Sequence, residues 1–112
     1  MTELAQKKCV ACEGTETPLN RTEAEILLKQ LSGWTLSGDA RWISKEFKFP
    51  DFKGAMSLAD KIGAVAESEG HHPDLQISWG KLVVELTTHA IKGLSENDFI
   101  LAAKIDELTR VS

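Results

Sequence analysis

The apolar positions of the first half of the chain follow a helical period and then a strand period. Thr22 and Glu25 have the spacing of a capping box, and apolar residues then recur on one helical face. Residues 34–37 and 41–49 predict two strands separated by turn residues, and therefore an antiparallel hairpin. The second strand alternates between apolar and polar residues, except that Lys45 interrupts its apolar face.

The second half of the chain repeats this order with longer elements. A long apolar stripe between Asp51, a good N-cap, and Gly70, a good helix terminator, predicts a second helix. Residues 75–79 and 81–89 predict two further strands joined by a tight turn. A last helix over 96–110 is apolar around most of its circumference, so we expect it to be buried on two sides and to contact another subunit.

The order of elements is helix, two strands, helix, two strands, helix. It predicts an α+β fold, in which three helices pack on one face of a four-stranded antiparallel sheet. We expect this single domain to span residues 21–112.

Residues 1–20 show little periodicity and predict a flexible or loosely docked tail. The tail holds both cysteines of the chain, Cys9 and Cys12, in a CxxC spacing. A structural zinc site needs four ligands, and the chain has no second CxxC. Three interpretations of the pair remain. The two cysteines have no role in the core activity, or they are a redox-sensitive pair, or they are half of a metal site that another subunit completes.

Length and charge restrict the class of protein. The chain has 112 residues, 42% of them apolar and 27% charged, with a net charge of −4. That composition is typical of one soluble globular domain, and the absence of a basic cluster argues against direct nucleic-acid binding. No apolar run reaches the roughly 20 residues of a membrane helix, and the first residues do not resemble a secretory signal. We therefore expect a cytoplasmic protein that does not bind a membrane.

The best candidates for chemistry are the histidines, whose side chains titrate near neutral pH. All three lie in the stretch 67–98: His71, His72 and His89. Pro73 favours an extended conformation at His72, and extended neighbours point to opposite sides, so the adjacent pair should not share one role. Three histidines can hold zinc, but diverging neighbours chelate poorly. We expect no metal.

Three other residues of this stretch have a functional and a structural interpretation. Glu67 lies four residues before His71 and either orients an imidazole or is an exposed helix charge. Asp98 either serves the site or stabilises a helix N-terminus. Trp79 is either an aromatic wall for a flat ligand or sheet packing. Trp34 and Trp42 are expected to pack in the core or at an edge.

Together these residues resemble the signature of the pterin-4a-carbinolamine dehydratases. The signature here consists of Glu67, His71-His72-Pro73, Trp79, His89 and Asp98, at the family's spacings. The resemblance extends over Thr88–Phe99 and Gly33-Trp34 and covers residues 21 to 110. Gly70 departs from it, because several members have a polar residue there, and the Cys9/Cys12 tail lies outside the family core.

The resemblance implies dehydration of a 4a-hydroxytetrahydropterin to quinonoid dihydropterin, without metal or cofactor, in the tetrahydropterin recycling that serves aromatic amino acid hydroxylation. It implies that His71 and His89 are the acid/base pair and that His72 mainly holds the substrate. Supporting and substrate-binding roles fall to Glu67, Pro73, Trp79, Thr88 and Asp98.

The resemblance also bears on partners. Family members form dimers by sheet pairing and tetramers through a helical bundle, so we expect a homodimer or a homotetramer. One member is a transcriptional coactivator, so the alternative function is a protein-interaction module on the same fold. A pterin-related role in molybdenum-cofactor metabolism is a further alternative. A binding module has no need for three histidines at these spacings with Glu67, which favours the enzyme.

Overall fold

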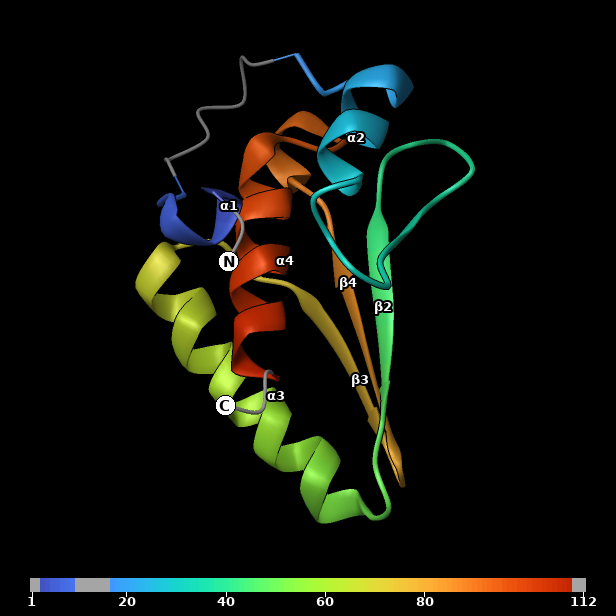
Figure 1. The fold of residues 1–112 in the computed structure, drawn as a ribbon, viewed down its shortest axis with the longest axis vertical. Coiled ribbons are helices and arrows are strands. Elements are labelled where there is room, and N and C mark those ends of the chain that lie inside the picture. The colour runs from blue at the N-terminus through green and yellow to red at the C-terminus, as the bar shows by residue number, and fades with distance from the viewer. Residues whose placement is uncertain (1–2, 10–16, 110–112) are drawn as a thin grey trace.

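A four-stranded antiparallel sheet forms one layer of the structure, and the helices cover one of its faces (Figure 1). The structure is a computed structural model that describes residues 3–9 and 17–109. Its elements in chain order are α1 (Glu3–Gln6), α2 (Arg21–Leu28), β1 (Thr35–Leu36), β2 (Ile43–Lys48), α3 (Phe52–Glu69), β3 (Asp74–Ser78), β4 (Lys81–Leu86), the 3₁₀ helix η1 (His89–Ile91) and α4 (Glu96–Leu108).

The strands lie in the order β1-β2-β4-β3, so the two hairpins meet through β2 and β4 at the centre of the sheet. Ile43 of β2 pairs with Leu86 of β4, and Leu75 of β3 pairs with Val84. Alternate residues of β4 point at the helices, and Leu82, Val84 and Leu86 are fully buried. The predicted α+β fold is confirmed, with α1 and η1 as additional short helices.

The helix that leads to the histidines begins and ends where its sequence predicts. The carboxylate of Asp51 accepts a hydrogen bond from the N–H of Gly54 at 2.7 Å, which caps the first turn of α3. Gly70 follows the last turn with φ 66°, a left-handed conformation that glycine adopts without strain. The chain direction changes there, immediately before His71.

The first predicted helix starts earlier than expected, and the Thr22/Glu25 capping box is wrong. Asn20 is the N-cap of α2, and its side chain accepts from the N–H of Glu23 at 2.8 Å. The carboxylate of Glu23 accepts in return from the N–H of Asn20 at 2.9 Å. The pairs Thr22/Glu25 and Asn20/Glu23 have the same capping-box spacing, so spacing alone does not distinguish them. The long-range backbone hydrogen bond from the N–H of Leu19 to the carbonyl of Leu94 fixes the chain just before Asn20.

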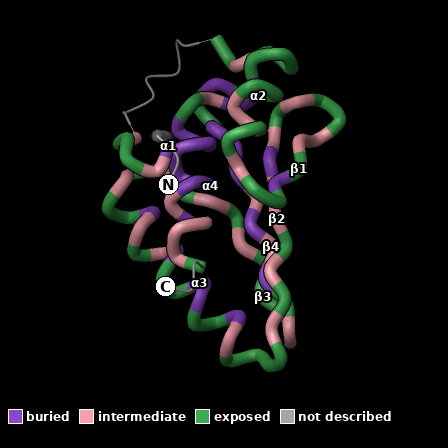
Figure 2. Tube along the Cα trace, in the orientation of Figure 1, coloured by how far each residue is buried: buried purple, intermediate pink, exposed green. Residues whose placement is uncertain are grey.

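The last helix, α4, is buried on several sides within one chain. Its residues 97–103 and Ile105 are buried, and Figure 2 shows it as the most enclosed helix, between α1, α3 and the sheet. Leu4 of α1 is only 1% exposed and belongs to the same core. Residues 3–9 therefore pack against α4. The sequence pattern, in contrast, predicts a flexible or loosely docked tail for residues 1–20. The apolar circumference of α4 needs no second subunit to cover it.

The lysine on the apolar face of β2 has a partner in α4. The Nζ atom of Lys45 lies 2.9 Å from Oδ1 of Asp106, and each side chain is about one-fifth exposed. The same carboxylate accepts from Nε1 of Trp34 at 3.0 Å. A paired lysine can occupy a position that faces the core, which explains the break in the alternation. Among the helices of the described residues, none has the length and apolar content to cross a membrane.

Candidate active site

Three chain segments meet at a pocket of about 260 Å³. They are the segment that leaves α3, the segment that follows β4, and the first turn of α4. The lining residues are Gly70, His71, His72, Thr87, Thr88, His89, Ala90 and Asn97. All three histidines of the chain thus line this one pocket.

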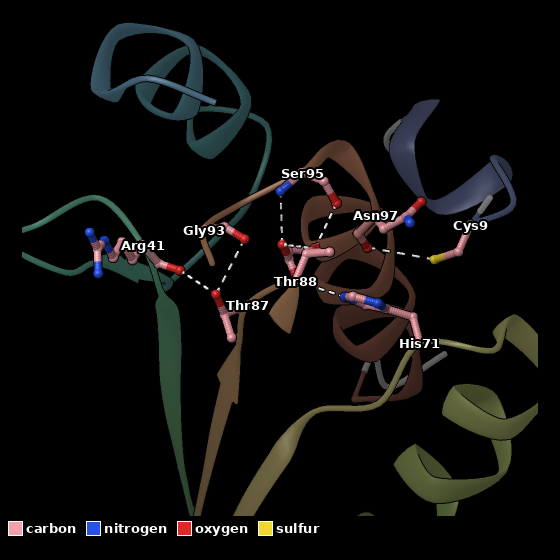
Figure 3. Close-up of polar contacts among 9 residues, drawn as sticks. Cys9, Arg41, His71, Thr87, Thr88, Gly93, Ser95 and Asn97 are labelled. Carbon is pink, nitrogen blue, oxygen red and sulfur yellow. Dashed lines mark hydrogen bonds and ion pairs between the residues drawn. The ribbon is translucent and has the colours of Figure 1, made fainter. Parts of the chain in front are cut away.

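His71 is held by the buried carboxylate of Asp98. Its Nε2 atom lies 2.6 Å from Oδ1 of Asp98, and the two side chains are 11% and 0% exposed. The other carboxylate oxygen, Oδ2, accepts from the hydroxyl of Thr88 at 2.8 Å and from the N–H of Ser95 at 2.9 Å. Figure 3 shows Thr88, Ser95 and His71 converging on this point. Both carboxylate oxygens are therefore engaged, and the imidazole has one preferred orientation.

This arrangement decides which nitrogen of His71 is available to a ligand. An ionised carboxylate can only accept hydrogen bonds, so Nε2 of the neutral ring carries the proton. Nδ1 then keeps its lone pair and is the nitrogen that can accept a proton from a bound molecule. The geometry gives His71 the chemistry of a general base oriented by a carboxylate.

His72 points to a different environment, as the extended conformation before Pro73 predicts. Its Nε2 lies 3.3 Å from Oε1 of Glu67, and these side chains are 57% and 80% exposed. Glu67 therefore contacts His72. Its spacing of four residues from His71 had suggested His71 as the partner. The chain leaves the helix at Gly70, so the helical neighbour relation no longer applies to His71.

His89 lies just past the end of β4, where it is exposed as the first residue of the 3₁₀ helix η1. The backbone pair of Thr88 and Gly93, with N–H to carbonyl distances of 2.9 and 3.4 Å, closes this loop. The ring of His89 forms an edge contact with Trp42, with centroids 5.8 Å apart and planes at 79°. The hydroxyl of Thr87 donates to the carbonyl of Arg41 at 2.6 Å and ties the loop to the start of β2 (Figure 3).

The other predicted site residues differ in how buried they are and in whether they reach the pocket. Thr88 is buried, and its hydroxyl is engaged with Asp98, so both residues are placed to orient His71. Pro73 lines a neighbouring groove against α3 together with His72. Trp79 lies at the β3–β4 turn, at the opposite end of β3 from the histidines, and is 73% exposed. The structure does not bring Trp79 to the pocket within one chain.

Several residues of the site were not among the predicted ones. Ser95 was not predicted as a site residue, yet its N–H donates to the carboxylate that holds His71. Thr87, Asn97 and Trp42 carry no local sequence signal for the site, because strand pairing and helix packing bring them there. Within residues 3–9 and 17–109, no three His, Cys, Asp or Glu side chains are grouped so as to hold a metal ion.

We predict that Asp98→Asn reverses the tautomer of His71 and leaves the fold intact. The amide oxygen can still accept from Thr88 and Ser95, but the NH₂ group then faces Nε2 of His71. Nε2 must become the acceptor, which moves the ring proton to Nδ1 and removes the base from the pocket. Two-bond ¹H–¹⁵N correlation spectra of the imidazole distinguish the two tautomers at a pH where the ring is neutral.

Glu67→Gln is the matched control, since it makes the same carboxylate-to-amide change next to the exposed His72. It should leave the His71 tautomer unchanged. A folded Asp98→Asn protein with the proton of His71 still on Nε2 would contradict the proposed orientation.

Comparisons with known proteins identify the family to which the chain belongs. Residues 17–108 match the family model described as pterin 4 alpha carbinolamine dehydratase. A Rickettsia bellii protein named "putative pterin-4-alpha-carbinolamine dehydratase" is 50% identical over 105 residues, which cover 94% of this chain and 93% of the relative. A protein of the same name from Halorhodospira halophila is 48% identical over 105 residues, covering 94% and 96% of the two chains.

Two solved structures have a similar fold. The structure titled transcriptional coactivator/pterin dehydratase from Brucella melitensis has a TM-score of 0.78 and 29% identity, and covers 84% of this chain and 100% of its own. A pterin dehydratase-like protein, described as a RuBisCO assembly factor in the alpha-carboxysome, has a TM-score of 0.60 and 22% identity over 72% of this chain and 94% of its own, and shows the fold alone. From the family model and these relatives, the chain belongs to the pterin-4α-carbinolamine dehydratase family.

Proposed function

We propose that this protein is a hydro-lyase that converts a 4a-hydroxytetrahydropterin to quinonoid dihydropterin and water. The observation that carries the proposal is the His71–Asp98 pair, in a pocket that His72 and His89 also line. The names of the relatives, which are half identical to this chain over nearly its whole length, support the same activity.

The reaction needs one proton donor and one proton acceptor. The C4a–O bond breaks, and the hydroxyl leaves as water when it receives a proton. N5 loses its proton, and its electron pair forms the C4a=N5 double bond. We assign the acceptor role to Nδ1 of His71, because Asp98 keeps the proton of the neutral ring on Nε2. The protonated ring of His89 supplies the other proton, and its exposure allows exchange with solvent to restore both groups.

The remaining residues hold the substrate or orient the histidines. His72 lines the pocket with an exposed side chain and mainly binds the pterin, with Glu67 beside it. Thr88 and Ser95 fix the carboxylate of Asp98. We place the activity in tetrahydropterin recycling, where the substrate is the 4a-hydroxypterin released by aromatic amino acid hydroxylation.

We predict different kinetic effects for the three histidines. His71→Ala and His89→Ala should each lower kcat by roughly 10²-fold, because each removes one proton-transfer group. The double variant should lose less than the product of the two losses, since the groups act as a unit. His72→Ala should raise KM more than it lowers kcat. The absorbance decay of the carbinolamine, with and without protein, measures all four.

Gln76→Ala on the exposed β3 strand is the control for a substitution near the site, and it should keep the wild-type rate. If His72→Ala abolishes turnover and His71→Ala is silent, the roles of the adjacent histidines are reversed. A wild-type protein that fails to accelerate the decay would refute the dehydratase proposal.

We also propose that the protein is a homodimer or homotetramer. A mostly apolar groove of about 570 Å³ lies between α3 and β3 and includes Met56, Leu75 and Ile77. Four large apolar side chains of α3, β3 and the β3–β4 turn are exposed: Phe52 (47%), Met56 (44%), Ile77 (37%) and Trp79 (73%). In the described sheet, β3 is an edge strand, whose free backbone groups can pair with another strand. A second copy of the chain would cover the apolar groove and pair with the edge strand β3.

The same surface supports the alternative function. The Brucella melitensis structure has a title that names both a transcriptional coactivator and a pterin dehydratase. A protein-interaction module on this fold would use the α3–β3 groove and would not need the three histidines.

We predict that Met56→Glu lowers the oligomeric mass. A carboxylate in the apolar groove should disfavour its burial against a second copy. Sedimentation equilibrium at micromolar concentration should show a dimer or tetramer for the wild type and a smaller species for the variant. Lys61→Glu, which places a carboxylate at an exposed position of the same helix outside the groove lining, is the control. A strictly monomeric wild type would contradict the oligomer proposal.

A further inference from the structure

Residues 3–9, which we call the N-terminal arm, pack behind the histidine pocket. Leu4 is 1% exposed in the core cluster, and Nζ of Lys104 in α4 donates to the carbonyl of Ala5 at 2.9 Å. Figure 1 shows α1 beside α4, next to the end of α3 that leads to the histidines. Apolar packing and a hydrogen bond thus fix the arm to the helix that carries Asp98.

The arm also binds the last residue of α3. The N–H of Cys9 donates to Oε1 of Glu69 at 2.8 Å. The other carboxylate oxygen, Oε2, lies 3.7 Å from Nζ of Lys104, and these two side chains are 12% and 18% exposed. Glu69 immediately precedes Gly70 and His71. The arm and α4 therefore both hold the point at which the chain leaves α3 for the pocket.

The thiol of Cys9 makes a second contact, to the first turn of α4. Its Sγ lies 3.6 Å from the carbonyl oxygen of Asn97, which lines the pocket and precedes Asp98 (Figure 3). Burial, together with the nearby Glu69 carboxylate, raises the pKa of the Cys9 thiol to about 12. The thiol is therefore protonated at neutral pH and can donate to this carbonyl.

We propose that the N-terminal arm is a positioning element of the active site. By holding Glu69 at the end of α3 and Asn97 at the start of α4, it keeps His71 in contact with Asp98. The arm lies outside residues 17–108, which the family model matches. This role needs neither a redox step nor a metal at the CxxC pair, whose second member, Cys12, lies outside the described residues.

The consequence for catalysis rests on the proposed dehydratase activity. Displacing a catalytic group by about 1 Å can cost up to roughly 10²-fold in rate. A loosened arm should therefore lower kcat, with little effect on substrate binding, because His72 contacts the exposed Glu67 and not Glu69, which the arm holds.

Two substitutions of Glu69 test the proposal without removing any core side chain. Glu69→Ala deletes the acceptor for the N–H of Cys9 and the partner of Lys104, and we expect it to lower kcat about 10-fold with little change in KM. Glu69→Gln keeps an acceptor oxygen of the same reach and should retain most of the rate. Lys8→Ala changes an exposed side chain on the same arm and should equal the wild type.

A second readout needs no substrate. The Nε2 proton of His71, hydrogen-bonded to Asp98, should shift and exchange faster with solvent in Glu69→Ala, but not in Glu69→Gln or Lys8→Ala. This NMR signal tests the positioning role even if the protein does not dehydrate pterins, so failures of the two proposals are distinguishable. Circular dichroism verifies that each variant is folded.

Two results would overturn the proposal. One is a folded Glu69→Ala protein with an unchanged His71 proton signal. The other is an equal loss in the Ala and Gln variants with that signal unmoved, which would assign the effect to the charge of Glu69 and not to the hold of the arm.

Discussion

The buried carboxylate of Asp98 is the contact on which the rest of the site depends. It is the one buried charged side chain among residues 3–9 and 17–109, with no exposed surface. A buried carboxylate is stable only when it is paired and hydrogen-bonded. The groups that donate to it must therefore stay in hydrogen-bonding positions. Those donors are His71 after α3, Thr88 after β4 and Ser95 before α4. One charge thus fixes the relative positions of the three segments that form the pocket.

The three histidines lie in different environments. His71 is nearly buried and has one fixed orientation, which suits a proton transfer that depends on geometry. His72 and His89 are exposed, one beside Glu67 and the other against Trp42, which suits contact with a ligand and exchange of protons with solvent. The same scaffold leaves a mostly apolar groove between α3 and β3 whose lining includes none of the three histidines. The proposed catalysis and the proposed association would therefore use different residues of one small domain.

Local signals in the sequence were sufficient for much of this architecture. The N-cap Asp51, the terminating Gly70 and the alternation of β4 each act within a few residues, so helix and strand positions were predictable. The divergence of His71 and His72 was also predictable, because Pro73 restricts the residue before it. These effects depend only on neighbouring residues.

The contacts that were not predictable join distant parts of the chain. His71 and Asp98 are 27 residues apart, and Cys9 and Glu69 are 60 residues apart. Asp98 at position N3 of α4 had a local explanation as a helix cap beside its functional one, and no local signal indicated that its partner is His71. Glu67 had a plausible partner by helical spacing, but the helix ends before that partner. Only packing of α3, α4 and the arm against one another determines these pairs.

We propose above that Asp98 orients His71 so that Nδ1 meets the reacting pterin. A crystal structure of the protein with a bound dihydropterin tests it most directly. We predict that Nδ1 of His71 lies within hydrogen-bond distance of the pterin ring, about 2.6–3.2 Å, while Nε2 remains on Asp98. A pterin bound outside this pocket, or a His71 ring turned away from Asp98 to bind it, would contradict the account.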